Sequence, residues 1–77
     1  MKKLVVSGKE VLNALLKIGF VFVRSKGSHT RLTRELSGRV FNVTVPIHGN
    51  KEINPTVLRS IIRQSGLTPD EFEKLFD

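Results

Sequence analysis

The chain contains no cysteine, tryptophan or tyrosine, and only one methionine. Without cysteine it forms neither disulfide bonds nor thiolate zinc sites, so packing alone must hold the fold, which suits a reducing compartment. Near the start of the chain, the apolar run consists only of Leu4, Val5 and Val6 before polar residues resume. This is too little for a signal-peptide core or a membrane span. We therefore expect a cytoplasmic protein that does not enter a membrane.

Acidic side chains are scarce outside the C-terminal end. The net charge is +6, and residues 1–69 carry 12 lysines and arginines against 3 acidic residues. So much positive charge on a single small domain, residues 1–77, favours a polyanionic partner, above all nucleic acid. A soluble domain with a lysine-rich surface would show a similar excess. Composition does not separate RNA from DNA or from an acidic protein.

Three segments have the caps and the apolar periodicity of helices. A capping box that starts at Ser7 precedes an apolar stripe in residues 7–18. Asn54 caps a second helix that ends at Gly66, and another capping box at Thr68 begins a short last helix.

Three strands are predicted between the first two helices. They cover residues 20–23, 29–35 and 39–45, with a turn at residues 36–38. The order α-β-β-β-α with a short C-terminal helix predicts an α+β fold, in which helices cover one face of an antiparallel three-stranded sheet. All five phenylalanines have core roles available in this arrangement. We therefore expect no exposed ring that stacks on bases.

The segment Lys26-Gly27-Ser28-His29 places a histidine at the start of the second predicted strand. Histidine exchanges a proton near neutral pH, and RNA cleavage by its own 2′-hydroxyl needs only proton transfer and charge stabilisation. Strand alternation puts His29 and Arg31 on the side opposite Leu32, which is the uncovered face of the sheet. His29 is thus our candidate catalytic residue, although a surface histidine without a function fits this segment equally well.

Basic residues elsewhere are candidates for phosphate contacts. They form three groups, Arg24 with Lys26, Arg31 with Arg34, and Arg59 with Arg63 on the second helix. Such patches suit structured RNA recognised by its shape, although the helix arginines also fit a merely solvated face. The predicted RNA-binding residues are Arg24, Lys26, Gly27, Ser28, Arg31, Lys51, Arg59 and Arg63.

His48 is the only other histidine and a candidate auxiliary group. Two histidines on opposite sides of a phosphate form an acid-base pair. A loop histidine between Pro46 and Gly49 is also common as a turn or hydrogen-bonding residue. Two histidines without clustered carboxylates fall short of the usual ligand sets, so we expect neither a metal ion nor another cofactor.

As a set, these residues resemble the HicA family of bacterial and archaeal toxins, which are small messenger-RNA interferases. The resemblance runs from about Ser7 to Phe76. It rests on Gly19-Phe20, Lys26-Gly27-Ser28-His29, Val45-Pro46-Ile47-His48-Gly49, Lys51-Glu52-Ile53, the run from Leu58 to Leu67, and Glu71-Phe72.

That resemblance implies a double-stranded-RNA-binding-domain-like fold and metal-independent cleavage of messenger RNA with His29 as the catalytic residue. It also implies a HicB antitoxin that covers the active face and inhibits the toxin. We expect a monomer when the chain is free and a hetero-oligomer with the antitoxin. Family members often carry a second histidine and a nearby aromatic residue, whereas Thr30 and Arg31 follow here.

Two other functions remain open at this point. One is a non-catalytic RNA-binding module of the same fold, in which the histidine contacts a 2′-hydroxyl or a phosphate. The other is a protein-interaction subunit whose basic face binds an acidic partner.

Overall fold

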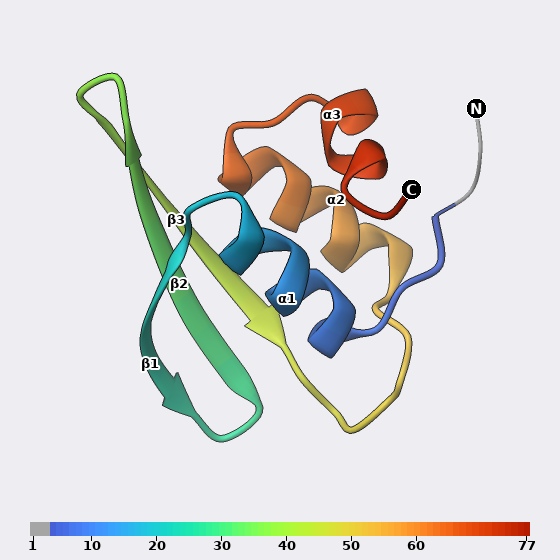
Figure 1. The fold of residues 1–77 in the computed structure, drawn as a ribbon. Helices are drawn as coiled ribbons and strands as arrows, with labels where there is room; N and C mark the ends of the chain where they lie inside the picture. The colour runs from blue at the N-terminus through green and yellow to red at the C-terminus, as the bar shows by residue number, and fades with distance from the viewer. Residues whose placement is uncertain (1–3) are drawn as a thin grey trace.

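The computed structural model describes residues 4–77 and has an α+β fold. The elements are α1 (Gly8–Lys17), β1 (Val21–Lys26), β2 (His29–Leu36), β3 (Arg39–Pro46), α2 (Pro55–Ser65) and α3 (Pro69–Lys74). The strands form one antiparallel sheet in the order β1-β2-β3, and the helices gather on one side of it (Figure 1). The predicted order α-β-β-β-α and the short last helix are confirmed. No helix within residues 4–77 is long and apolar enough to cross a bilayer.

All three helices begin at the predicted caps. The Ser7 hydroxyl accepts the N–H of Glu10, and the Glu10 carboxylate accepts the N–H of Ser7. Asn54 caps α2, and Thr68 with Glu71 repeats the capping box at α3. The backbone and side-chain hydrogen bonds of Thr68 hold the pKa of Glu71 below its usual value. These short-range bonds satisfy helix N–H groups that would otherwise lack a partner.

The core lies between the helices and one face of the sheet. Strand alternation turns Leu32 of β2 toward the helices, where the side chain is fully buried. The core comprises Val6, Val11, Leu15, Phe20, Leu32, Val43, Val45, Leu58, Ile61 and Phe72. It therefore joins α1, α2, α3, β2 and β3 in a single apolar cluster.

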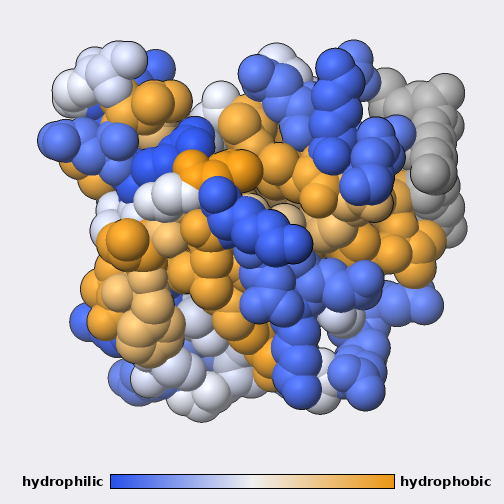
Figure 2. Space-filling model, in the orientation of Figure 1, coloured by the Kyte–Doolittle hydropathy of each residue, from blue (hydrophilic) through white to orange (hydrophobic). Residues whose placement is uncertain are grey.

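The edge strand β1 differs from the sequence prediction. It spans Val21–Lys26 instead of residues 20–23, and Phe20 precedes it in the core. The expectation of a core role for Phe22 was wrong, because that side chain is 58% exposed. Among residues 4–77, β1 pairs with β2 alone, so one side of the strand is open there. The side chains of Val21, Phe22 and Val23 are all exposed, and Figure 2 shows apolar surface at this edge of the sheet.

Arg34 stands next to Arg31 in one of the three basic groups, but strand alternation puts it on the side of Leu32. It lies on the helix side of β2, where Nη1 donates a hydrogen bond of 2.9 Å to the Ile18 carbonyl at the end of α1. Its guanidinium also lies 4.9 Å from the centroid of the Phe20 ring. A cation is favourable at a helix C-terminus and over an aromatic face. Arg34 therefore joins α1 to the sheet.

Replacing Arg34 by methionine keeps the aliphatic length and removes the guanidinium. We expect Arg34→Met to lower the free energy of unfolding by about 1–2 kcal/mol, since it loses the carbonyl hydrogen bond and the cation–π contact. Urea denaturation measures the change. Arg39→Met is the matched control, because Arg39 also lies over a ring, 5.5 Å from the Phe41 centroid, but is exposed. Equal losses in the two variants would contradict the role of Arg34.

Two glycines with nearly the same φ allow a second test. Gly38 in the β2–β3 turn has φ +78°, and Gly66 after α2 has φ +80°. A methyl group at Gly38 meets no atom within 4 Å, whereas one at Gly66 would overlap the ring of Phe41. We expect Gly38→Ala to cost about 1–2 kcal/mol from backbone strain alone. Gly66→Ala should lower the free energy of unfolding by about 1–3 kcal/mol more than Gly38→Ala, as measured by thermal or urea unfolding. Equal losses in the two variants would show that the Phe41 ring moves aside freely.

Candidate active site

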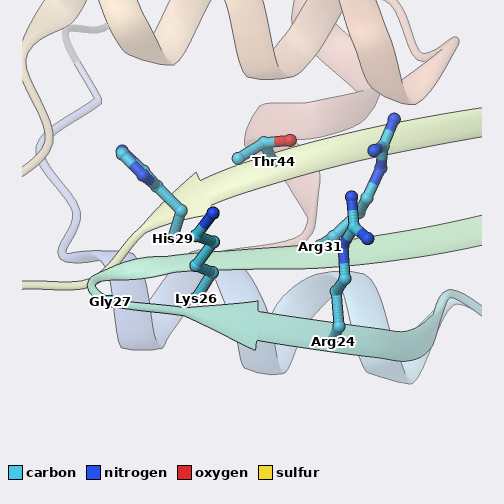
Figure 3. A pocket seen from close by; sticks show the side chains of 6 residues that line it. All are labelled: Arg24, Lys26, Gly27, His29, Arg31 and Thr44. Carbon is cyan, nitrogen blue, oxygen red and sulfur yellow. The ribbon is translucent and has the colours of Figure 1, made fainter.

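A basic hollow opens on the face of the sheet that the helices leave uncovered. It has a volume of about 510 Å³ and is lined by Arg24, Lys26, Gly27, His29, Arg31 and Thr44. Figure 3 shows the five longer side chains rising from three neighbouring strands on the same side of the sheet. Five of these six residues are among the predicted site residues. The structure thus brings half of the ten predicted site residues together.

The strand register arranges five of the lining residues, with Pro46 at their border, in two rows across the sheet. Arg24 of β1 is opposite Arg31 of β2, which is opposite Thr44 of β3. Nearer the β1–β2 turn, Lys26 is opposite His29, and His29 is opposite Pro46. We call these the arginine row (Arg24, Arg31, Thr44) and the histidine row (Lys26, His29, Pro46).

A β-bulge at Val23 sets which β1 side chains join the hollow. Phe22 pairs with Leu32 on the core side, and Arg24 pairs with Arg31 on the open side, so Val23 is an extra residue between them. In an unbroken strand, Arg24 would share a face with Phe22 and point to the core side. The bulge restores Arg24 and Lys26 to the face of His29. Sequence reasoning missed this feature.

Backbone contacts fix the end of the sheet that carries His29. Gly27 begins the two-residue β1–β2 loop with φ +58°, a conformation that favours glycine. The Ser28 carbonyl accepts the N–H of Ile47 at 2.7 Å, which ties this loop to the chain after β3. Gly8 packs against the same segment, because a Cβ there would overlap the Pro46 carbonyl oxygen.

Thr44 was not among the predicted site residues. Alternation along β3 gives the signal, since Thr44 lies two residues from Asn42 on the face opposite Val43 and Val45. Its N–H donates to the side-chain oxygen of Gln64 at 3.2 Å, so α2 holds the outer edge of β3 at the hollow. Thr44 adds a neutral hydroxyl to an otherwise cationic surface.

The hollow combines one proton-transfer group with strong positive charge. His29 is exposed and carries the only imidazole among the lining residues, and imidazole is the side-chain group most often used for proton transfer. No carboxylate is among the lining residues in the part of the chain that the structure describes. Cationic side chains directly opposite each other repel, so a bound polyanion would relieve an unfavourable arrangement. The surface is therefore suited to an anionic substrate.

The remaining predicted residues lie outside the hollow. Ser28 contributes its carbonyl to the loop contact described above. His48 and Lys51 line a second, smaller hollow of about 200 Å³ beyond Pro46. Arg59 and Arg63 are exposed on α2, and an Arg59 nitrogen lies 3.3 Å from the Thr56 hydroxyl. Within residues 4–77, no three histidine or acidic side chains gather as a metal-binding cluster.

The chain matches a known protein family. The family model described as the HicA toxin of bacterial toxin-antitoxin matches residues 8–67 of the 77-residue chain. The matched segment contains α1, the whole sheet and α2, and so includes every residue that lines the basic hollow. No curated protein matches the chain.

Two single-residue deletions test the bulge. Removing Val23 leaves a regular strand in which Arg24 is still opposite Arg31. Removing Ser25 also leaves a regular strand if Lys26 stays opposite His29. In that variant, however, Val23 is opposite Arg31 and the Arg24 side chain turns to the core side. We expect cross-strand nuclear Overhauser effects between residues 24 and 31 to persist only in the Val23 deletion. Loss of the contact in both variants would contradict this register.

Proposed function

We propose that this chain, which belongs to the HicA toxin family, is a cytoplasmic endoribonuclease that cleaves messenger RNA and so inhibits translation and growth. The observation that carries the proposal is the position of His29 among cationic side chains on the uncovered face of the sheet. Family membership supports RNA as the substrate, and the positive charge of the hollow is complementary to the negative charge of RNA.

In the proposed reaction, the RNA provides its own nucleophile. The 2′-oxygen attacks the adjacent phosphorus and the bond from phosphorus to O5′ breaks, which leaves a 2′,3′-cyclic phosphate and a 5′-hydroxyl. His29 either accepts the proton of the 2′-hydroxyl or donates a proton to O5′, and solvent completes the other transfer. Lys26, directly opposite His29, stabilises the charge that develops on the phosphate oxygens. This chemistry requires no metal ion.

Other basic residues extend the proposed RNA contacts beyond the hollow. Arg59 and Arg63 stand one turn apart on the exposed face of α2, and Gln64 next to them contacts β3 at Thr44. Phosphates outside the cleaved bond can contact such a surface, where they add affinity without reading sequence. Lys51 in the smaller hollow is a further candidate for this role.

The proposed protein partner is a HicB-like antitoxin that forms a hetero-oligomer with the otherwise monomeric toxin. The family is that of toxins from bacterial toxin-antitoxin systems, so a neutralising partner is expected. An antitoxin that covers the basic hollow would exclude RNA from His29. Acidic side chains would suit its contact surface, because the hollow presents four basic side chains and no carboxylate among the described residues.

A specific observation keeps a non-catalytic RNA-binding module as the second candidate. His29 has no second imidazole beside it in the hollow, since His48 lines the separate smaller one. A histidine that only contacts a phosphate or a 2′-hydroxyl, without proton transfer, needs no second imidazole beside it.

Cleavage assays with His29→Ala test the proposed mechanism. We expect the unmodified protein to cleave messenger RNA equally well with and without a chelator, and His29→Ala to lose about 10²–10⁴-fold in rate. The products should carry cyclic phosphate and 5′-hydroxyl ends. A rate that rises with pH assigns His29 as the base, and one that falls assigns it as the acid.

The comparison with His48→Ala separates the two histidines. We expect a change of less than about tenfold in that variant, because its side chain lies outside the hollow that holds His29. Equal cleavage by the unmodified protein and His29→Ala, or loss of cleavage on chelation, would refute the mechanism. Salt-dependent RNA binding without any product would favour the non-catalytic module.

A further inference from the structure

The two rows of the basic hollow differ in chemistry. The arginine row carries two guanidinium groups and the Thr44 hydroxyl, none of which transfers a proton near neutral pH. The histidine row carries an ammonium group, an imidazole and the apolar ring of Pro46. Only the second row has a group that can act on a reacting bond. The first row is equipped solely to bind.

The spacing of the rows fits two separate phosphates. Residues directly opposite across antiparallel strands have Cβ atoms about 4.5–5.5 Å apart, so Arg24 and Arg31 approach one anion from two sides. The rows are two residues apart along β2, which corresponds to roughly 6–7 Å. This separation is comparable to the distance between neighbouring phosphates on one RNA strand. The volume of about 510 Å³ leaves room for more than a single phosphate group.

Charge alone disfavours the paired arginines unless an anion lies between them. Glu35 is the acidic residue on the same face of β2, but it is opposite Val40 and four residues beyond Arg31, at roughly 13 Å. Figure 3 shows Arg24 and Arg31 standing beside each other above the sheet, with Lys26 and His29 nearer the Gly27 turn. Guanidinium groups bind phosphate oxygens in pairs through parallel hydrogen bonds, which a lysine cannot do.

From these observations we infer that Arg24 and Arg31 form a subsite for the phosphate next to the one that is cleaved. The inference rests on the proposed function, since it assigns the histidine row to the scissile phosphate. Thr44 completes the subsite with a neutral hydroxyl. The subsite makes substrates with two consecutive phosphates bind more tightly than those with one, and it sets the minimum length of RNA that the enzyme uses efficiently.

Short oligonucleotides isolate the contribution of the second phosphate. A dinucleotide with one phosphate and a trinucleotide with two, in which the sugar on the 5′ side of every phosphate is 2′-deoxy, bind without being cut. We expect the trinucleotide to bind the unmodified protein about tenfold more tightly, because the two guanidinium groups form charge-assisted hydrogen bonds with its second phosphate. In Arg24→Gln and in Arg31→Gln, the ratio of the two dissociation constants should fall to about 1–2.

The matched control is Arg39→Gln, which removes the same charge from an exposed arginine at the far end of the sheet. That variant should keep the tenfold ratio. An unchanged ratio in Arg24→Gln and Arg31→Gln, or an equal fall in Arg39→Gln, would overturn the subsite. Because binding is measured without cleavage, the result is independent of the nuclease assay. A tenfold ratio in a protein that cuts no RNA would refute the proposed catalysis and still support the subsite.

Discussion

The burial of Leu32 in the central strand fixes the orientation of the whole candidate site. Its side chain is fully buried among residues of the core, so the neighbours His29 and Arg31, at odd spacing from it, must point to the other face. A slip of one residue would bury an imidazole and a guanidinium and expose the core. The apolar contacts that stabilise the domain therefore also hold the charged groups in place, and no separate scaffold is needed.

On the open face of the same sheet, basic side chains lie close together, which is unfavourable. Arg24 and Arg31 are opposite each other, as are Lys26 and His29, and no acidic side chain among the described residues lines the hollow between them. The like-charged pair of Arg24 and Arg31 weakens the sheet in the absence of a ligand. The core on the other face offsets that loss, and an anionic substrate reverses it. A site of this kind binds through charge that the fold holds in place before the ligand arrives.

Contacts remote from the hollow keep its borders in position. The Arg34 hydrogen bond to Ile18 fastens α1 to β2, and the bond from Thr44 to Gln64 fastens α2 to the outer edge of β3. Gly8 allows α1 to begin directly against the Pro46 carbonyl. Substitutions at these positions are expected to disturb the site without contact to a substrate, since they act through strands that carry His29 and its neighbours.

Much of the fold and part of the site follow from local sequence signals. Capping residues such as Ser7 and Thr68 and the alternation around Leu32 are short-range features, so the helices, the strand order and the exposure of His29 could be predicted. The family resemblance is likewise visible in the sequence and agrees with the family match. The wrong expectation concerns Phe22, whose exposure depends on which strand lies at the edge of the sheet. Alternation places Arg34 on the side of Leu32, but its hydrogen bond to Ile18 depends on where α1 ends.

The sequence by itself determined the elements, the basic character and the single histidine at the start of β2. Only the tertiary structure decided which basic residues join it. The bulge at Val23 reverses the alternation of β1, and a bulge is set by pairing with β2 and by the burial of its neighbours, neither of which is encoded in the spacing along one strand. The arginine row exists because three strands are held in one register, an interaction between segments that are separate in the chain.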